Sequence, residues 1–341
     1  MDTGSTMART ERLAADAEGV SRAAALLLCG ETVALPTETV YGLGAHALEP
    51  AAVAKVFSAK QRPGWDPLIV HVWDRAMLER VAVVPDGAKP LIEAFWPGPL
   101  TLLLPRMPSV PDAVTAGRAL VGVRMPRHPV MLEVLRAAGI PVAAPSANRF
   151  GHTSPTTAEH VLEDLDGRIA AVLDGGPTQV GVESTVLDVS VSPMVIYRPG
   201  AVTLEQIQRV AGPVRLHVTD GHTATDTPES LPSPGVGIRH YAPRAKLLLV
   251  RDEVEMEAAV ARLGSGMRVG VMLPDGWRAV CDADAFAWGD WTDGTELARR
   301  LFAGLRDLDA RGVDVIVCPL PQLGGVGEAL RDRLEKAARR S

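Results

Sequence analysis

The chain carries Pro36-Thr37-Glu38-Thr39-Val40-Tyr41-Gly42-Leu43-Gly44 and, shortly after it, Lys60-Gln61-Arg62-Pro63. The first stretch places hydroxyl groups and a flexible glycine turn directly after a strand-like run at residues 32–35. The second places two cations, one residue apart, at the end of a helix-like run at residues 51–59. Hydroxyls, permissive backbone and cations together suit a pocket that holds a polyphosphate and a small polar molecule side by side.

Strand-like and helix-like patterns alternate on either side of these two stretches. A helix-like segment runs from about Glu11 to Cys29, and further helical patterns cover residues 130–138 and 157–165. The alternation predicts an α/β domain that ends near Val210. Its strand-like runs are residues 32–35, 68–72, 100–104, 121–125, 142–144, 171–174, 185–189 and 195–198.

A shift in composition separates a second unit from the first. Residues 217–233 are rich in Thr, Asp, Pro, Ser and Gly, which predicts a mobile linker. Beyond it, a second alternating set typical of a small Rossmann-like unit comprises residues 247–250, 253–263, 269–272, 295–308, 313–318 and 328–338. The expected organisation is a disordered tail (1–11), an α/β domain (12–212), a linker (213–245) and a Rossmann-like C-terminal domain (246–341).

Composition limits the classes of function. At 341 residues and 47% apolar content the chain can bury substantial cores, and its net charge of −6 argues against a bulk polycationic surface. Any contact with nucleic acid is therefore expected to be local. The three cysteines, Cys29, Cys281 and Cys318, lack metal or redox spacing, which favours the reducing cytoplasm. The sequence shows neither a secretory signal nor an apolar run of membrane length, so we expect no membrane association.

The hydroxyls and glycines of the first stretch have two interpretations. Thr37 and Thr39 suit a ligand pocket, but they also suit a turn or a cap. Gly42 and Gly44 would let backbone N–H groups approach a phosphate. The Gly-Lys-Ser/Thr ending of a phosphate-binding Walker loop is missing, so the glycines alone are weak support.

Four cations at the ends of predicted elements form the strongest pattern. Lys60 and Arg62 follow a helix, where cations also offset the helix dipole. Arg124 comes after the apolar residues 121–123 and Arg198 after residues 195–197, so each lies at a strand end. A structural salt bridge explains any one of them, but a polyanionic ligand explains all four together.

Several polar residues at strand ends are further candidates. His71 closes the Leu68-Ile69-Val70 strand, where it can point into a cleft or be an ordinary core or surface histidine. Ser146 follows another strand, and Ser154 either lines a ligand or caps the next helix. A metal site at His217, Asp220 and His222 is disfavoured because these residues lie in the predicted linker, and we expect no protein-held metal.

Taken together, these motifs resemble the threonylcarbamoyl-adenylate synthases, enzymes with a YrdC-type catalytic domain. The resemblance covers about residues 12–212, and the rest of the chain looks like the long form of the family with a linker and an appended C-terminal domain. It implies a twisted mixed sheet with flanking helices. The matching motifs are residues 36–44, Lys60-x-Arg62-Pro63, Pro67-Leu68-Ile69-Val70-His71, Trp96-Pro97-Gly98-Pro99-Leu100-Thr101, Val123-Arg124-Met125-Pro126, Pro145-Ser146-Ala147-Asn148, Gly181-Val182-Glu183-Ser184-Thr185, Arg198-Pro199-Gly200 and His240-Tyr241-Ala242-Pro243.

The resemblance implies a nucleotidyltransferase reaction in the cytoplasm. L-threonine, bicarbonate and ATP, the last with bound Mg²⁺, would give threonylcarbamoyl-AMP and pyrophosphate. The product would pass to the proteins that complete N6-threonylcarbamoyladenosine next to the anticodon of tRNA. A weak direct contact with tRNA is part of this expectation.

The resemblance also assigns residues to the two substrates. Lys60 and Arg62 would be catalytic. The threonine pocket would comprise Thr37, His71, Arg124, the backbone of Ala144, and Ser184. The nucleotide side would comprise Lys60, Arg62, Thr115, Ser146, Ser154, Arg198 and Tyr241. Asp66 departs from the family pattern, which often has Asn there, and is left out of the site.

The linker and the C-terminal domain leave several interpretations open. Tyr241 in segment 231–245 would close over the nucleotide as a lid, or the segment is a passive packed tether. The C-terminal domain is interpreted as a regulatory or docking module. Two other functions are an RNA-binding protein with a local basic patch, and a carbamoyl-adenylate enzyme of metallocentre maturation that uses carbamoyl phosphate. The acidic balance disfavours the first, and the missing cysteine pairs disfavour the second.

Overall fold

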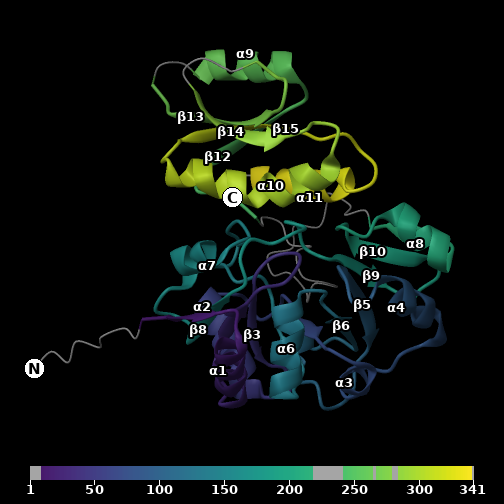
Figure 1. The fold of residues 1–341 in the computed structure, drawn as a ribbon. Helices are drawn as coiled ribbons and strands as arrows, with labels where there is room; N and C mark the ends of the chain where they lie inside the picture. The colour runs from purple at the N-terminus through teal and green to yellow at the C-terminus, as the bar shows by residue number, and fades with distance from the viewer. Residues whose placement is uncertain (1–8, 218–240, 264–265, 279–282, 340–341) are drawn as a thin grey trace, which may run out of the picture.

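Two sheets, each with its own helices, make up the protein. The computed structural model describes residues 9–217, 241–263, 266–278 and 283–339. Within them lie an eleven-stranded sheet and a four-stranded sheet. Figure 1 shows the smaller sheet and its helices seated on one side of the larger part of the chain.

The larger sheet is mixed. Its strands, in spatial order, are β1 (Glu11–Ala14), β8 (Ala171–Asp174), β2 (Val33–Leu35), β3 (Gly42–His46), β7 (Val142–Ala143), β4 (Ile69–His71), β6 (Leu120–Arg124), β5 (Leu100–Pro105), β9 (Thr185–Asp188), β10 (Met194–Arg198) and β11 (Val214–Leu216). β4 and β6 are parallel, whereas β5 and β6 are antiparallel. The central strands are nearly continuous apolar runs because helices and loops cover both faces of the sheet.

Helices flank this sheet. They are α1 (Ala17–Leu28), α2 (Pro50–Lys60), α3 (Arg75–Glu79), α4 (Lys89–Phe95), α5 (Asp112–Thr115), α6 (Pro129–Ala138), α7 (Ala158–Leu165) and α8 (Leu204–Ala211), with a 3₁₀ turn η1 at Asp86–Ala88. Helix α1 begins where the side chain of Asp16 accepts a hydrogen bond from the Gly19 N–H. It buries Val20, Ala23 and Leu27, which recur at helical spacing and pack with α6.

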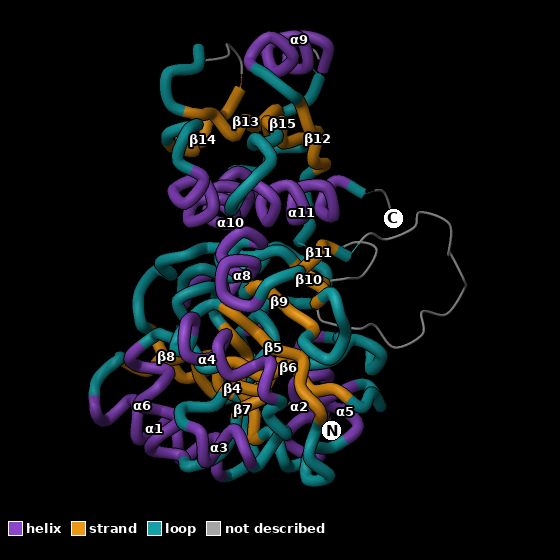
Figure 2. Tube along the Cα trace, turned by 90° about the vertical axis from the view of Figure 1, so that its right-hand side faces the viewer, coloured by secondary structure: helices purple, strands orange, loops and turns teal. Residues whose placement is uncertain are grey.

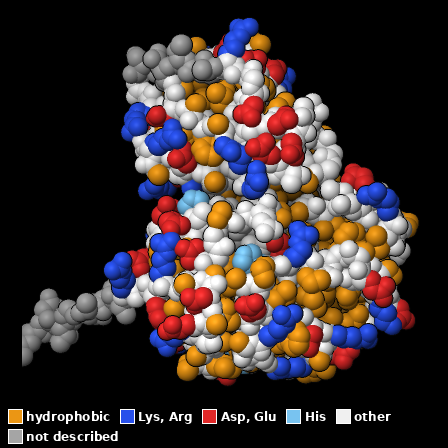
Figure 3. All heavy atoms as spheres, in the orientation of Figure 1, with side chains coloured by type: hydrophobic (Ala, Val, Ile, Leu, Met, Phe, Trp, Pro, Cys, Tyr) orange, Lys and Arg blue, Asp and Glu red, His pale blue; other side chains and the backbone are white. Residues whose placement is uncertain are grey.

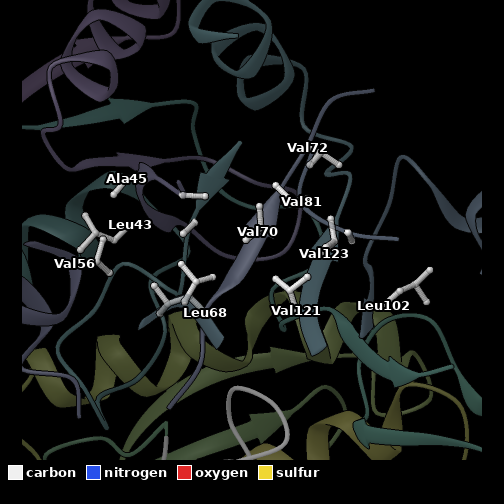
Figure 4. Close-up of a cluster of buried hydrophobic side chains, with 14 of the residues drawn as sticks. Leu43, Ala45, Val56, Leu68, Val70, Val72, Val81, Leu102, Val121 and Val123 are labelled. Carbon is white, nitrogen blue, oxygen red and sulfur yellow. The ribbon is translucent and has the colours of Figure 1, made fainter. Parts of the chain in front are cut away.

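The main core lies between the central strands and the helices. Figure 4 shows its side chains converging from several strands, with Val56 of α2 among them. Val70, Val123 and Leu102, on the neighbouring strands β4, β6 and β5, are 0% exposed. Full burial of each such side chain contributes about 1.5–3 kcal/mol, so this core holds the strand ends that carry the polar residues in place.

The smaller sheet is wholly parallel. Its spatial order is β12 (Lys246–Val250), β15 (Val315–Pro319), β13 (Val269–Pro274) and β14 (Ala283–Gly289). Its helices are α9 (Glu253–Leu263), α10 (Gly294–Ala310) and α11 (Gly327–Ala338). Figures 1 and 2 show α10 and α11 between this sheet and the larger domain, with α9 on the opposite face. The large mixed sheet with flanking helices and the smaller parallel sheet confirm the expected fold class.

The two parts share a hydrophobic cluster. Val40 and Val182 of the larger domain belong to the same buried cluster as the apolar faces of α10 and α11. Gly181 has a φ of 80°, and a Cβ there would lie 2.4 Å from the carbonyl oxygen of Ala298 in α10. Only glycine permits this close backbone approach, so the contact between the domains requires glycine at position 181.

Three local expectations are wrong. The segment 11–29 is not one helix, because β1 occupies Glu11–Ala14 before α1 begins. The sheet continues past Val210, since β11 pairs with β10 inside the stretch expected to be linker. The glycines at 42 and 44 lie in strand β3, antiparallel to β2, and not in a phosphate-binding turn. A Cβ on Gly44 would lie 2.9 Å from Val142, so close packing explains this glycine.

None of the described helices has the length and apolar character needed to span a lipid bilayer. Figure 3 shows acidic and basic side chains interspersed over the visible face, without one continuous basic surface.

Candidate active site

A cavity lined by many polar and charged residues lies over the centre of the larger sheet, where Tyr241 closes part of it. Its interior space is about 50 Å³, and the whole hollow amounts to about 530 Å³ when the open solvent at its mouth is included. Its lining residues come from strands and loops far apart in the sequence: Thr37, Thr39, Val40, Gly42, Arg62, Ile69, His71, Arg124, Ala144, Pro145, Ser146, Glu183, Ser184, Arg198 and Tyr241.

Strand register creates this cluster. β4 and β6 run parallel with His71 opposite Arg124, so the last residues of the two strands are neighbours. On the next strand, β5, the hydroxyl of Thr101 lies 2.8 Å from that of Ser184, which directly precedes β9. Side chains from four adjacent strands therefore form one polar row across the sheet.

All five residues expected to form the threonine pocket line this cavity: Thr37, His71, Arg124, Ala144 and Ser184. The Thr37 hydroxyl donates to the carbonyl of Val40 (2.6 Å) and lies 2.9 Å from the Thr39 hydroxyl. The Thr39 side chain, in turn, contacts Arg124. Thr39 was singled out in the sequence but not assigned to the site, and its place beside Thr37 and Arg124 comes from the turn.

His71 is a neutral imidazole. It is 3% exposed, and burial, reinforced by the positive charge of Arg124, lowers its pKa to about 3. Its Nδ1 has no hydrogen-bond partner among the described residues. Since a neutral imidazole has one N–H donor and one acceptor, His71 can bind a polar ligand without adding charge.

Arg124 is already held by three groups of the protein. It donates from Nε to the carbonyl of Gly98 (3.1 Å) and from Nη1 to the Thr39 hydroxyl (2.9 Å). Its Nη2 lies 2.7 Å from a carboxylate oxygen of Glu38, which is 1% exposed. Burial opposes ionisation of Glu38, but Arg124 outweighs it, so the pKa of Glu38 is lowered. A ligand carboxylate at Arg124 would share this guanidinium with Glu38.

Of the residues expected to bind the nucleotide, four line the cavity: Arg62, Ser146, Arg198 and Tyr241. Arg62 donates to the carbonyls of Asp66 (3.1 Å) and Pro67 (2.8 Å). Its Nη2 also lies 2.9 Å from the carboxylate of Asp66, and both side chains are nearly inaccessible. Asp66 therefore serves as the buried counter-ion of Arg62.

Three of the expected nucleotide residues do not line the cavity: Lys60, Thr115 and Ser154. Lys60, at the end of α2, is 1% exposed and donates from Nζ to the carbonyls of Ser146 (2.6 Å) and Asn148. Burial and the nearby Arg62 lower its pKa well below the ordinary value. Lys60 thus holds the turn that presents Ser146, so the structure brings three of the four expected cations to the cavity wall.

Arg198 and Tyr241 form another part of the wall. Arg198 donates from Nε to the Ser184 carbonyl (3.0 Å) and from Nη2 to the Ser184 hydroxyl (3.1 Å). The ring of Tyr241 is 1% exposed and stacks on Phe302 of α10, with ring centroids 5.8 Å apart. Tyr241 therefore contacts the C-terminal domain and the cavity at once. Residues 231–240 of the proposed lid lie outside the described residues.

Glu183 lines the cavity although sequence reasoning did not assign it to the site. It accepts a hydrogen bond from the Ser154 hydroxyl (2.5 Å) and pairs with Arg333 of α11 at 2.8 Å. The signal was present, since Glu183 directly precedes Ser184 in a quoted motif. Its partner Arg333, 150 residues away, could come only from the folded structure.

Comparison with known proteins agrees with this geometry. Residues 25–200 match the Sua5/YciO/YrdC family model, described as telomere recombination. Residues 202–339 match the model described as the C-terminal domain of threonylcarbamoyl-AMP synthase. The chain belongs to the threonylcarbamoyl-AMP synthase family.

Relatives within this family are similar along nearly the whole chain. The threonylcarbamoyl-AMP synthase of Bacillus subtilis is 45% identical over 96% of this chain and 95% of its own. That of Pyrococcus abyssi is 44% identical over 93% of both chains. A crystal structure of P. abyssi Sua5 complexed with L-threonine has a TM-score of 0.88 and 41% identity, and covers 96% of this chain and 97% of its own.

The described residues contain no group of three or more His, Cys, Asp or Glu side chains that could hold a metal ion. Of the disfavoured linker set, Asp220 and His222 lie outside the described residues. The His217 ring lies 4.9 Å from that of Tyr197. Glu183, the one carboxylate among the described lining residues, already pairs with Arg333.

Proposed function

We propose that this protein is an L-threonylcarbamoyladenylate synthase, a nucleotidyltransferase that makes threonylcarbamoyl-AMP and pyrophosphate from L-threonine, bicarbonate and ATP. Membership of the family supports this assignment. The observation that carries it is the single cavity in which the cations Arg62, Arg124 and Arg198 lie beside a neutral His71. Such a wall suits one strongly anionic ligand next to a small amino acid.

The threonine would bind at the end of the polar row. The P. abyssi relative was crystallised with L-threonine, and all five residues expected to bind threonine here line the cavity. Arg124 would bind the carboxylate, while Thr37, His71 and Ser184 would contact the hydroxyl and the amine. Glu38 restrains Arg124, so this cation is oriented before the ligand arrives.

The proposed reaction needs the two substrates to be aligned, and it needs no covalent intermediate with the enzyme. The threonine amine adds to CO₂ derived from bicarbonate and loses a proton, which gives a carbamate. A carbamate oxygen then attacks the α-phosphorus of ATP, and the bond to the leaving pyrophosphate breaks with its electron pair. Arg62 and Arg198 would neutralise the charge that develops on the phosphates.

The cofactor we expect is Mg²⁺ bound to ATP. Magnesium commonly binds through substrate phosphates and a few carboxylates, and it keeps several waters. The described cavity wall fits this mode because its one carboxylate, Glu183, is already paired with Arg333. Mg²⁺ would add charge neutralisation at the phosphates, and Arg62 and Arg198 would orient the ATP that carries it.

The product would be used for tRNA modification in the cytoplasm. A mixed anhydride of a carbamate and AMP is labile, so burial beneath Tyr241 would protect it from water. Downstream transfer proteins would place the threonylcarbamoyl group on the adenosine next to the anticodon. Direct tRNA contact would be weak, in keeping with the mixed charges on the face in Figure 3.

The decisive experiment measures pyrophosphate release by the full chain with ATP and Mg²⁺, and omits threonine and bicarbonate in turn. We expect release to require both substrates, and mass spectrometry to identify threonylcarbamoyl-AMP. ATP turnover that is indifferent to threonine would contradict the proposal. Tight, salt-sensitive RNA binding without ATP turnover would favour an RNA-binding protein instead.

A further inference from the structure

One buried arginine of the C-terminal domain reaches the cavity wall of the other domain. Arg333 lies on α11 and is 1% exposed. Its Nε donates to Glu183 at 2.8 Å, and its guanidinium carbon lies 5.1 Å from the centre of the Tyr241 ring. Both partners line the cavity. Arg333 therefore touches the wall from behind without lining it.

These contacts close a ring of interactions around the wall. Glu183 is followed in the chain by Ser184, which accepts a hydrogen bond from Arg198 at 3.1 Å. Arg198 and Tyr241 line the same cavity wall. Tyr241 faces Arg333, which pairs with Glu183 and also with its neighbour Asp332. Of the five members, three come from the larger domain and the fourth is Tyr241. Arg333 is the one member that comes from the C-terminal domain.

The backbone of Tyr241 makes this support necessary. Its φ is 66°, a left-handed conformation that a residue with a side chain adopts only where surrounding contacts hold it. Phe302 stacks on one part of the ring, and the Arg333 cation lies over it. Both contacts belong to the C-terminal domain, so that domain fixes a side chain of the cavity wall.

The charges explain why an arginine stands here. Glu183 is a carboxylate in the wall of a cavity suited to an anion, where it would repel phosphates. Burial raises the pKa of Glu183, but the positive charges of Arg333 and Arg198 lower it by more. The net pKa is therefore lowered, and the carboxylate is ionised. Without Arg333, Arg198 would be the remaining cation that lowers the pKa of Glu183, so the carboxylate would offset the cation that faces the ligand.

We propose that Arg333 is a positioning residue of the catalytic site: it neutralises Glu183 and fixes Tyr241, so that Arg198 keeps its charge for the phosphates of the nucleotide. This inference rests on the proposed function. It assigns the C-terminal domain a definite part in building the nucleotide pocket.

A second interdomain arginine makes its contacts away from this cavity wall. Arg306 of α10 pairs with Glu163 and Asp164 of α7 at 2.8 Å each, and it donates to the Thr153 carbonyl at 2.6 Å. Neither carboxylate lines the cavity. Arg306 joins the domains, whereas Arg333 joins the C-terminal domain to the cavity wall.

The test compares Arg333→Met, Glu183→Gln and the double variant in the full chain. We expect Arg333→Met to raise KM for ATP about tenfold, equivalent to about 1.4 kcal/mol, with a smaller change in KM for threonine. Adding Glu183→Gln removes the uncompensated charge, so KM for ATP should return most of the way to the wild-type value. Arg331→Gln, on the same helix and bonded to the Pro321 carbonyl, is the matched control expected to behave as wild type.

A purely structural role predicts the opposite pattern. Glu183→Gln cannot restore a lost domain contact, so a double variant as impaired as Arg333→Met would overturn the inference. An unchanged KM for ATP in Arg333→Met would also overturn it. If Arg333→Met alone does not fold, the double variant is compared with Glu183→Gln. A double variant that binds ATP tenfold more weakly than Glu183→Gln does would refute the proposal.

Calorimetric binding of ATP–Mg²⁺ separates this inference from the proposed function. If the wild type binds ATP but makes no threonylcarbamoyl-AMP, the proposed function fails on its own. The loss of ATP affinity in Arg333→Met and its recovery in the double variant would still support the role of Arg333. Equal ATP affinity in all variants would refute that role whatever the reaction is.

Discussion

Acidification should destabilise this protein through His71. The side chain is 3% exposed, and its pKa falls from 6.5 to about 3 on folding. Between these values the unfolded chain binds a proton that the folded chain rejects, so the free energy of unfolding decreases as the pH falls. The contribution is absent above pH 6.5 and complete near pH 3.

The size of the effect follows from the shift. Each pKa unit corresponds to about 1.36 kcal/mol, so at pH 5, which is 1.5 units below the unfolded pKa, the loss is about 2 kcal/mol. The full shift of about 3.5 units, from 6.5 to about 3, corresponds to about 5 kcal/mol at or below pH 3. His160, whose pKa is lowered to about 4, adds a similar slope that a His71 variant retains.

The assay is urea unfolding of the wild type and His71→Asn at pH 7.5 and pH 5. Asn keeps a donor and an acceptor but cannot be protonated, so the drop in unfolding free energy between the two pH values should be about 2 kcal/mol smaller in the variant. A drop of equal size in both proteins would refute the reasoning. So would an NMR titration that places the pKa of His71 near 6.5.

Three further outcomes are expected. Arg124→Lys keeps the charge but loses the contacts to Thr39 and Glu38, so KM for threonine should rise about tenfold while KM for ATP changes little; equal changes in both would contradict this. Asp66→Asn removes the counter-ion of Arg62 and should tighten ATP binding by about 1 kcal/mol, roughly fivefold, as measured by calorimetry. Weaker ATP binding would mean that Asp66 serves only to hold Arg62. Lys60→Met leaves the carbonyls of two turn residues without their donor, so unfolding free energy should fall by about 1–3 kcal/mol along with turnover. Unchanged stability with lost activity would instead indicate direct contact of Lys60 with phosphate.

Local patterns located most elements of the fold. The apolar period predicted α9 at its observed bounds, residues 253–263, because its ends are marked and its burial is one-sided. It failed at β1, where a strand of four residues precedes a helix without a strong break. The apolar pattern also failed to predict β14, the alternating run Ala283–Gly289. Pairing with β13 makes this run a strand, and its own strand propensity does not.

The candidate site shows the same division. Arg62, His71, Arg124 and Arg198 were identified from their places at element ends, and the sheet brings these ends to one cavity. Lys60 was expected at the phosphates for the same reason. It instead bonds two backbone carbonyls, because one turn of the chain passes directly over the end of α2. Position along the chain does not reveal which group a long side chain will meet.

The sequence by itself determined the alternation of elements, the family motifs and the presence of cations at strand and helix ends, because these depend on residue type and short-range spacing. Tertiary structure alone decided which cation lines the cavity, which one braces a turn, and which carboxylate neutralises each arginine. The physical reason is that a buried charge must find a partner in three dimensions. For Glu183 that partner is Arg333, 150 residues further along the chain.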